Sequence, residues 1–308
     1  MYDLIIIGGG PGGTAGAVYA ARKQLKTLML TSEFGGQSSV SEDIKNWIGT
    51  ISISGADLAK SFKAHVVAHT GPYLDLKEGA KVAKIEKMPD NTFTVTTEND
   101  ESFQSKTVLI TAGSEHRKLT IEGADTYENK GITYCASCDG PLFSGQDVAV
   151  IGGGNAAFES ALQLQAYCKT VTIINRSDKF RADPETVEKV LAKPNIKVRK
   201  NVEMLAVVGE QFVTGLKIKD TTTGVEETLP LGGIFVEIGQ IPNSALAKGL
   251  VEVNDQGKIV IDPWTQRTSV EGIWAAGDVT NILYHQNNIA AGDAVRALEN
   301  IYQWVAQR

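Results

Sequence analysis

The sequence is poor in cysteine and proline and has no long hydrophobic run. It contains 3 cysteines and 9 prolines in 308 residues. Three cysteines are too few for the disulfide framework of a secreted domain, and the composition does not indicate disorder. No apolar run is long enough to cross a bilayer, and the first residues lead into a strand rather than a signal peptide. We therefore expect no membrane partner and a cytoplasmic location.

Positive charge is also scarce. The formal net charge is -6, the pI is about 5.4, and lysine and arginine form no cluster in the chain. Because binding to a nucleic-acid backbone requires clustered basic side chains, we expect no nucleic-acid partner. The sequence does have 42% hydrophobic residues and 31 glycines, which is typical of a globular protein. Its length exceeds what one hydrophobic core usually supports, so two domains are expected.

The sequence contains one strand-helix-strand pattern twice. Leu4–Ile7 is an apolar run closed by glycine, typical of a buried strand, and the alanine-rich segment Thr14–Arg22 is typical of a helix. Thr27–Leu30 is the strand that follows. The second copy consists of Val148–Ile151, Asn155–Gln165 and Val171–Ile174.

A glycine-rich turn joins strand and helix in the first copy. The first glycine of the dinucleotide-binding fingerprint permits a tight turn, the second lets backbone amides approach a pyrophosphate, and the third lets helix and strand pack closely. The motif in this context predicts a dinucleotide site. Glu33, a little beyond the expected strand end, is the candidate ribose contact. The predicted binding residues of the turn are Gly8, Gly10, Pro11, Gly12 and Gly13.

The second copy carries a similar turn that ends in alanine, which the fingerprint permits. No carboxylate stands at the tip of its second strand to accept a ribose 2′-hydroxyl, whereas Arg176 and Arg181 could pair with a 2′-phosphate. This favours NADPH as the coenzyme. NADH stays open, because the arginines could form a solvated loop and Asp178 could contact a ribose. The predicted binding residues of the turn are Gly152, Gly154, Asn155 and Ala156.

A strand-rich stretch follows each copy, and the chain ends in a helix at about Asn288–Ala306. The segment after Asn243 is too short to be a domain, so we expect it to complete the first one. We therefore predict an α/β protein with two Rossmann-like dinucleotide-binding domains, the second inserted into a discontinuous first. The first domain would comprise residues 1–113 and 244–308, and the second residues 114–243. The further expected strands are Lys81–Glu86, Thr92–Thr97, Ser105–Ile110, Gln211–Ile218 and Glu226–Leu231.

Cys135 and Cys138 form a Cys-x-x-Cys pair between the two turns. Such a pair closes a small disulfide loop, and a thiol that opens a helix has a lowered pKa, so the pair can be reduced by a flavin and oxidised by a protein disulfide. Asp139 is the candidate general acid or base for the leaving thiolate. Two dinucleotide sites and a dithiol together indicate an enzyme that moves electrons from a nicotinamide to a disulfide through a flavin.

A metal site is the alternative interpretation of the cysteine pair. Zinc would need two further ligands, and His65 and His69, spaced i, i+4 on an expected helix, are the paired candidates. Histidines at this spacing more often form a helix face, so we predict no metal. The third cysteine, Cys168, lies in or just past the second-copy helix and is predicted to be a packed small hydrophobe.

Several further motifs give the chain a family resemblance. It resembles the low-molecular-weight thioredoxin reductases over essentially its whole length. The segment Tyr134–Phe143 is, more closely, similar to the flavoprotein subunit of bacterial alkyl hydroperoxide reductase, which carries an additional N-terminal thioredoxin-like region. The motifs that carry the resemblance are Gly8–Gly13, Phe34–Gln37, Ile110–Gly113, Cys135–Gly140, Gly152–Ala157 and Gly277-Asp278.

The resemblance implies a homodimer with FAD in the discontinuous domain, NADPH in the inserted one, and a domain rotation that presents nicotinamide and dithiol to the flavin in turn. By the same resemblance, Cys138 would face the flavin as the charge-transfer thiolate, Cys135 would attack a protein disulfide, and Asp139 would be the acid catalyst. The other residues implied in FAD binding are Gly36, Gln37, Asn46, Thr111, Ala112, Gly113, Gly277, Asp278, Gln286 and Asn287.

The chain departs from the family pattern in two places. NADPH-dependent members usually have His-Arg-Arg where this chain has Asn175-Arg176-Ser177, which removes one phosphate-binding arginine. Members often place an arginine where His285 stands before Gln286, so the FAD contact there is expected to differ.

The leading hypothesis is an FAD-dependent disulfide reductase that passes electrons from NADPH through the dithiol to a thioredoxin-like protein. One alternative is an NADH- or NADPH-dependent reductase of a glutaredoxin or peroxiredoxin system. Another is a flavin electron-transfer oxidoreductase with a non-disulfide acceptor, in which the dithiol would be vestigial. The intact sequence from Cys135 to Gly140 argues against this last class.

Overall fold

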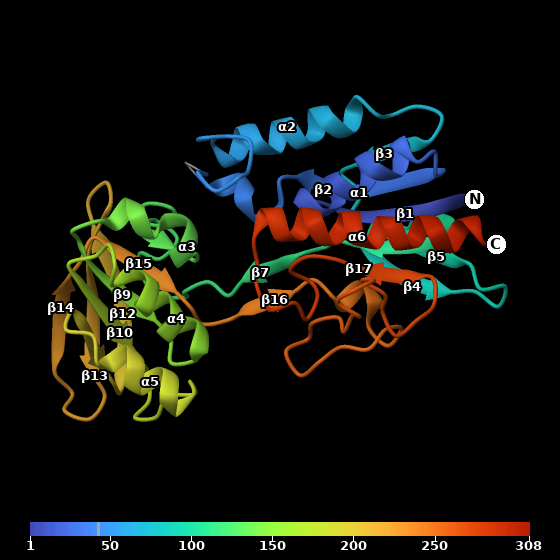
Figure 1. Ribbon diagram of the computed structural model, residues 1–308. Helices are drawn as coiled ribbons and strands as arrows, with labels where there is room; N and C mark the ends of the chain where they lie inside the picture. Colours follow the sequence, from blue (N-terminus) through green and yellow to red (C-terminus); the bar gives the residue numbers. More distant parts are fainter. Residues whose placement is uncertain (42–43) are drawn as a thin grey trace. The chain divides into compact units, whose positions relative to one another are not determined.

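The structure, a computed structural model, describes residues 1–41 and 44–308, and the chain divides into two compact units (Figure 1). The first unit consists of Met1–Glu115 and Ile241–Arg308, and the second of His116–Gln240. The sequence placed the two crossings at residues 113 and 243. Which nucleotide each unit binds stays a prediction.

The first unit is built on a mixed β-sheet. Its strands are β1 (Tyr2–Gly9), β2 (Thr27–Phe34), β3 (Leu74–Glu78), β4 (Val82–Lys87), β5 (Phe93–Thr97), β6 (Ser102–Ile110) and β17 (Ile273–Ala275). The order is β3-β2-β1-β6-β5-β4, and β17 also pairs with β6. The pairs β3-β2, β2-β1, β1-β6 and β6-β17 are parallel. The pairs β6-β5 and β5-β4 are antiparallel.

Helices cover one face of this sheet. They are α1 (Pro11–Arg22), α2 (Gly55–Val67) and α6 (Asn287–Ala306), and short 3-10 turns lie at η1 (Gly36–Val40) and η3 (Ala245–Ala247). Because side chains alternate along a strand, Leu4 and Ile6 of β1 pack with the helices, whereas Ile5 and Ile7 belong to a second buried cluster on the other face. The apolar run of β1 is therefore buried on both sides, as expected for a parallel strand.

The second unit contains two sheets. The parallel sheet has the order β11-β10-β9-β15-β8, formed by β8 (Ile132–Thr133), β9 (Asp147–Ile151), β10 (Thr170–Ile174), β11 (Ile196–Arg199) and β15 (Gly233–Val236). An antiparallel sheet is formed by β12 (Val202–Gly209), β13 (Val213–Asp220) and β14 (Glu226–Pro230). The helices are α3 (Ala136–Asp139), α4 (Asn155–Leu164) and α5 (Pro184–Leu191), with a 3-10 turn at η2 (Gly140–Phe143). The short strands β7 (Ser114–His116) and β16 (Gln240–Pro242) pair with each other.

The strand order of the parallel sheet identifies its ligand-binding edge. From β9 the chain goes to β10 and β11 on one side, and then to β15 on the other side of β9. In sheets of this type a dinucleotide binds at the carboxyl ends of the strands where the order reverses. In the second unit this point lies between β9 and β15.

The predicted fold class is confirmed, and each expected strand overlaps an observed one. One expectation is wrong in detail: β2 continues to Phe34, so Glu33 lies inside the strand and not beyond its end. Hydrogen bonding continues past the apolar run because β1 stays paired with β2 as far as Gly9 and Phe34. An apolar pattern does not reveal such an extension, since the added residues are partly exposed.

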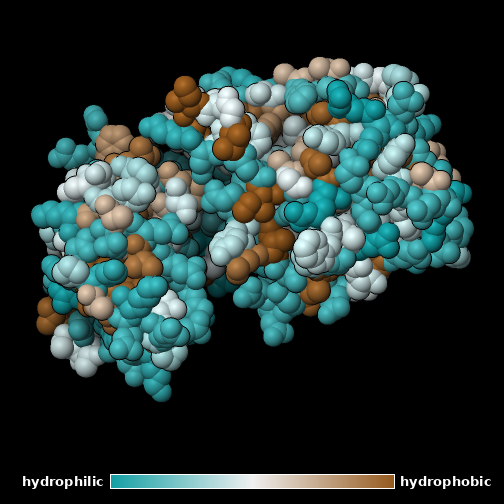
Figure 2. All heavy atoms as spheres, in the orientation of Figure 1, coloured by the Kyte–Doolittle hydropathy of each residue, from teal (hydrophilic) through white to brown (hydrophobic). Residues whose placement is uncertain are grey.

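Apolar side chains are gathered inside the units, and the face drawn in Figure 2 is mostly hydrophilic. Among the described residues, no helix combines the length and the apolar character needed to cross a membrane.

Candidate active site

The first glycine turn is packed against the end of β6. Gly8 has a φ of +115°, and a Cβ atom there would lie 2.4 Å from the carbonyl oxygen of Thr111. A Cβ atom on Gly13 would lie 1.8 Å from the carbonyl oxygen of Gly8. Side chains do not approach backbone oxygens this closely, so both positions need glycine for the fold itself.

Gly10 is surrounded differently. It is the N-cap of α1 and offers no side-chain cap, and Pro11 takes the first helical position. A Cβ atom on Gly10 would come no closer than 4.0 Å to another atom, the Cα of Gly36. The first amides of α1 therefore have no capping side chain, and the space beside Gly10 is open. This is the arrangement that lets a pyrophosphate approach a helix N-terminus.

The loop after β6 is held by one asparagine. The Asn243 side chain donates to the carbonyl oxygen of Ala112 at 3.0 Å, and its backbone N–H donates to that of Gly113, also at 3.0 Å. Gly113 has a φ of +68°. The Thr111 hydroxyl donates to the carbonyl oxygen of Ile7 at 2.8 Å. The predicted residues Thr111, Ala112 and Gly113 thus lie at the carboxyl ends of β1 and β6, next to the turn.

Polar side chains from two distant segments meet at the beginning of α6. Ser38 Oγ donates to Asn287 Oδ1 at 2.8 Å, and Asn46 Nδ2 donates to Gln286 Oε1 at 3.1 Å. Asn288 Nδ2 donates to the carbonyl oxygen of Asn46 at 2.7 Å. Next to Ser38, Gln37 donates through Nε2 to the carbonyl oxygen of Ser114. The structure therefore brings Asn46, Gln286 and Asn287 together in the first unit.

Asp278 is part of a charged cluster that the sequence did not reveal. Asp278 Oδ1 lies 3.3 Å from His285 Nδ1, and His285 Nε2 lies 2.8 Å from Lys258 Nζ. Burial lowers the pKa of Lys258, and the charge of Asp278 opposes that shift. An ammonium that donates to Nε2 places the ring hydrogen on Nδ1, which faces Asp278. Lys258 and His285 thereby lie in line next to Asp278, a predicted FAD-binding residue that follows Gly277 with its φ of +75°.

The second glycine turn repeats the division of roles seen in the first. Gly152 has a φ of +150°, and a Cβ atom there would lie 2.5 Å from the carbonyl oxygen of Glu237. One on Gly153 would lie 2.2 Å from Asn175 Oδ1. Gly154, the N-cap of α4, would have no atom within 4 Å of its Cβ. Gly154 is therefore the counterpart of Gly10.

The side chain of Asn175 organises the loop after β10. It is buried, and its Nδ2 donates to the carbonyl oxygens of Ser177 and Lys179 at 2.8 and 3.0 Å. Arg176 and Arg181 are exposed, and within the described part of the chain no ion pair engages either side chain. The backbone N–H of Arg181 donates to the carbonyl oxygen of Gly153 at 2.7 Å. This bond fixes Arg181 directly beside the second turn.

Asn155 and Ala156 occupy the exposed first turn of α4. The Asn155 side chain donates to Asp183 Oδ2 and accepts from the Asp183 backbone N–H, both at 2.8 Å. These two bonds tie the start of α4 to the start of α5. They leave the backbone amide of Asn155, and not its side chain, for the predicted coenzyme contact.

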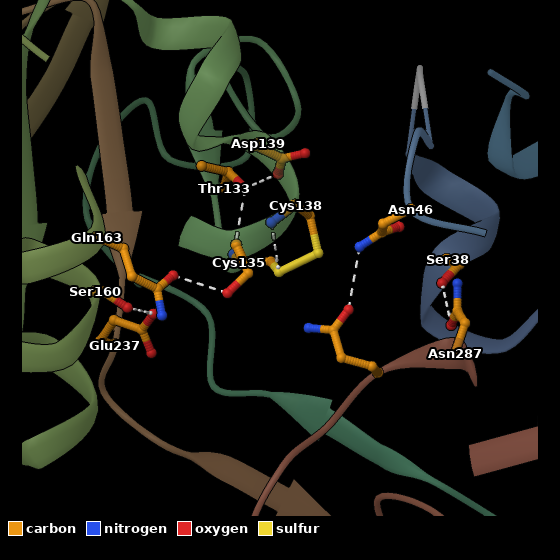
Figure 3. Close-up of a disulfide and its surroundings, with 12 residues drawn as sticks. Ser38, Asn46, Thr133, Cys135, Cys138, Asp139, Ser160, Gln163, Glu237 and Asn287 are labelled. Atoms are coloured by element: carbon orange, nitrogen blue, oxygen red, sulfur yellow. Dashed lines mark hydrogen bonds between the residues drawn. A yellow bond between two sulfur atoms is a disulfide. The ribbon is translucent and has the colours of Figure 1, made fainter. Parts of the chain in front are cut away.

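Cys135 and Cys138 form a disulfide at the start of α3 (Figure 3). Cys135 is the N-cap residue, and its Sγ accepts a hydrogen bond of 3.1 Å from the Cys138 backbone N–H. Cys135 is half-buried and Cys138 is exposed. Ser137 Oγ donates to Gln163 Oε1 at 2.8 Å, which ties the dithiol helix to α4. The disulfide therefore belongs to the same compact unit as the second turn.

Asp139 directly follows Cys138 and is half-buried. Burial raises the pKa of its carboxyl, and the Thr133 hydroxyl, which donates to Oδ2, opposes that shift. A carboxyl with a raised pKa keeps its proton to higher pH. This is the property required of a group that protonates a leaving thiolate.

The remaining candidate residues do not form a site. Burial raises the pKa of the Cys168 thiol to about 11, which suits a packed and unreactive side chain. His69 lies past the end of α2, and its Nδ1 is 2.9 Å from the carbonyl oxygen of His65. The residues that the structure describes contain no cluster of three or more His, Cys, Asp or Glu suited to a metal.

Comparison with known proteins identifies the family. The family model for pyridine nucleotide-disulphide oxidoreductases matches residues 2–298. The chain belongs to this family. Membership implies FAD and a pyridine nucleotide as cofactors, and the chain is an oxidoreductase of this family.

Relatives within the family fall into two groups. The F subunit of the Staphylococcus epidermidis alkyl hydroperoxide reductase is 37% identical over 304 residues, which are 99% of this chain and 59% of that protein. Among solved structures, thioredoxin reductase from Streptococcus pyogenes has a TM-score of 0.92 and 33% identity, covering 100% of this chain and 99% of its own. Thioredoxin reductase from Giardia duodenalis has a TM-score of 0.92 and 30% identity, covering 99% of both chains. The chain spans about 59% of the length of the curated relatives it matches.

Several polar residues at the site gave no signal in the sequence. Thr133 contacts the predicted residue Asp139, and Lys258 contacts His285, which precedes the predicted residue Gln286. Glu237 follows β15 and bonds to Ser160 of α4. An isolated charge after an apolar strand gives no sequence signal of its own. Only the strand order, which brings β15 beside β9, shows that Glu237 lies at the second turn.

Proposed function

We propose that this protein is a disulfide reductase that passes electrons from NADPH, through FAD and the Cys135-Cys138 dithiol, to the disulfide of a thioredoxin-like protein. The observation that carries the proposal is the disulfide itself. It stands in one unit with a dinucleotide turn and is followed directly by a half-buried carboxyl, that of Asp139, whose pKa is raised. Both thioredoxin reductases compared above cover nearly the whole chain.

The first unit fits FAD. Gly10 leaves room for a pyrophosphate, and Glu33 is exposed near the end of β2, where an adenosine ribose would lie. Asp278, Gln286 and Asn287 supply polar groups at the start of α6. FAD, when bound, supplies a carrier that takes two electrons from the coenzyme and releases them to a disulfide.

The residues of this chain then handle the sulfur and proton chemistry. Reduction of the disulfide adds two electrons and two protons and breaks one S–S bond. In the proposed roles, Cys138 receives the electrons, Cys135 attacks the disulfide of the protein substrate, and Asp139 donates a proton to a leaving thiolate. The Thr133 hydroxyl accepts from the Cys135 backbone N–H at 3.4 Å and donates to Asp139, so one side chain links the first cysteine to that carboxyl.

The second unit fits a phosphorylated coenzyme. Arg176 and Arg181 stand on either side of the loop that Asn175 organises, and both are exposed. Since the Asn175 amide is used within the loop, it is not free to read a ribose. We therefore propose NADPH over NADH, with the 2′-phosphate bound by these arginines.

The partner, the homodimer and the cytoplasmic location belong to the proposal too. A second candidate function is reduction of a peroxiredoxin system through a glutaredoxin-like carrier, and the 37% identity to the Staphylococcus epidermidis alkyl hydroperoxide reductase protein supports it. Assays with purified thioredoxins and glutaredoxins from the same source discriminate the two by kcat/KM.

Replacement of the cysteines tests the proposal. Cys135→Ser and Cys138→Ser should each abolish reduction of protein disulfides, yet leave NADPH-dependent reduction of FAD measurable by its loss of absorbance. Thr133→Ser, which keeps the hydroxyl beside Asp139, is the matched control and should stay active. Near-normal disulfide turnover in both cysteine variants would refute the dithiol route.

A further inference from the structure

Glu237 lies at the point of the second unit where the nicotinamide half of a dinucleotide binds. It directly follows β15, and its backbone N–H donates to the carbonyl oxygen of Ile151 in β9 at 2.8 Å. The order of the sheet reverses between these two strands, so the coenzyme crosses the sheet here. The adenosine half lies toward β10 and its arginines, which leaves the β15 side for the nicotinamide half. The inference rests on the proposed coenzyme binding by this unit.

Near neutral pH, the Glu237 carboxyl can change between its neutral and its ionised form. Ser160 Oγ donates to Oε1 at 2.5 Å, whereas Oε2 has no hydrogen bond within the described residues (Figure 3). Burial raises the pKa of Glu237 to about 7, the hydrogen bond from Ser160 lowers it, and the charge of Glu159 raises it. Glu159, the residue before Ser160 on α4, is the charged group that acts on this carboxyl. The backbone of Glu237 contacts the backbone of Ile151 in β9 and packs against Gly152 of the glycine turn.

The redox state of the coenzyme changes the charge beside this carboxyl. When the reduced ring gives up a hydride, which is one proton and two electrons, the ring goes from neutral to a charge of +1. A cation stabilises a nearby carboxylate and lowers its pKa, and a neutral ring does not. By linkage, the enzyme with an ionised Glu237 must bind the oxidised coenzyme more tightly than the enzyme with a neutral Glu237 does.

We propose that Glu237 senses the redox state of the bound nicotinamide, holding its proton beside the reduced ring and releasing it to solvent beside the oxidised ring. The acid dissociates into carboxylate and proton, and no further reactant is needed. Glu237 is thus a positioning and specificity residue for the coenzyme. As the pH rises, its ionised carboxylate favours retention of the oxidised coenzyme.

The test measures equilibrium binding to the FAD-loaded enzyme from pH 6 to pH 9. The probes are NADP⁺ and 1,4,5,6-tetrahydro-NADP, whose neutral ring cannot donate hydride. The versions of both probes that lack the 2′-phosphate are measured as well, so that a preference for NADP or NAD does not decide the result. In the wild type, the ratio of the Kd of the oxidised form to that of the neutral form should fall about tenfold as the pH rises. In Glu237→Gln the ratio should be independent of pH.

Two neighbouring variants sharpen the test. Glu159→Gln removes a negative charge, so the change in the ratio should move to lower pH with its size kept. Ser160→Ala removes the bond that favours the ionised form, so the change should move to higher pH. A merely structural role of Glu237 would alter all four affinities together and leave the ratio unchanged.

The failure of this inference is distinguishable from failure of the proposed coenzyme site. Adenosine 2′,5′-bisphosphate and AMP contain only the adenosine half, so their affinities should be the same in the wild type and in Glu237→Gln. If neither fragment nor dinucleotide binds the wild type, the second unit is not the coenzyme site and both proposals fall. If the dinucleotides bind and the wild-type ratio is constant with pH, or the change persists in Glu237→Gln, the redox-sensing role alone is overturned.

Discussion

The two glycine turns share a layout but use their surroundings differently. In both, the first glycine has a positive φ against the backbone of a neighbouring strand end, and the N-cap glycine faces open space. The two turns differ at the third conserved position of the fingerprint. In the first turn it is Gly13, whose Cβ would lie 1.8 Å from the Gly8 oxygen, whereas the second turn holds the side chain of Ala157. The second turn is therefore wide enough for one more carbon atom.

The residues at the strand tips differ as well. Glu33, the residue before the last of β2, has an exposed carboxylate, whereas the corresponding tip of β10 carries the buried amide of Asn175 and then Arg176. A carboxylate accepts hydrogen bonds from a ribose, and an arginine binds a phosphate. In the proposed assignment, the motif fixes where a dinucleotide binds, and the residue at the strand tip decides which one.

Substitution at the third position should have the largest effect. Gly13→Ala introduces a carbon atom into backbone that cannot move freely, so we expect a loss of more than about 4 kcal/mol of stability or no folded protein. Thermal unfolding followed by circular dichroism measures it. Gly10→Ala, in open space, is the matched control and should unfold close to the wild-type temperature. Equal stability of the two variants would contradict the division of roles within the turn.

The open glycines should separate the two cofactors. Gly10→Val should fold but bind little FAD, because the added side chain blocks the pyrophosphate. Gly154→Val should keep its yellow colour and lose affinity for NADPH, by about 100-fold if about 3 kcal/mol of contacts are lost. Absorbance at the flavin band and coenzyme titration measure the two effects. Full FAD occupancy in Gly10→Val would contradict the assignment of FAD to the first turn. Loss of FAD in Gly154→Val would indicate that FAD binds at the second turn instead.

The arginines should decide the coenzyme. Each well-formed bond to a 2′-phosphate contributes about 1.5–3 kcal/mol, or roughly 10- to 150-fold in binding. Arg176→Ala and Arg181→Ala should therefore lower kcat/KM for NADPH and leave that for NADH unchanged. Lys179→Ala, in the same loop, is the control. A wild-type preference for NADH that neither arginine variant alters would mean that these side chains face solvent in the complex.

Glu237 should make stability depend on pH. Its pKa of about 7 lies above that of an exposed glutamate, so the folded state keeps a proton that the unfolded state loses. This group's contribution is fully present below the unfolded pKa and is lost as the pH rises toward 7. Glu237→Gln should therefore be more stable than the wild type at pH 8, by about 1–3 kcal/mol, and equal to it at pH 4. Chemical denaturation at both values measures the difference, and an equal gain at both would exclude titration as the cause.

Much of the site was readable from the sequence because motifs are local. The turns at Gly8 and Gly152 and the pair of cysteines follow from spacing alone, and the structure places all of them at strand or helix ends. Three contacts were not readable. Glu237 approaches the turn through strand order, Lys258 reaches His285 across 27 residues, and Asn175 turns inward to hold a loop. Each depends on tertiary packing that no local pattern encodes.

An anaerobic reductive titration separates the two halves of the proposed reaction. FAD and the disulfide each take two electrons, so the wild type should consume about two molecules of NADPH per chain before free NADPH accumulates. The double variant Cys135→Ser/Cys138→Ser should consume about one, with the flavin fully bleached. Consumption of about one molecule by both proteins would show that the dithiol does not receive electrons from the flavin, and would contradict the proposed route.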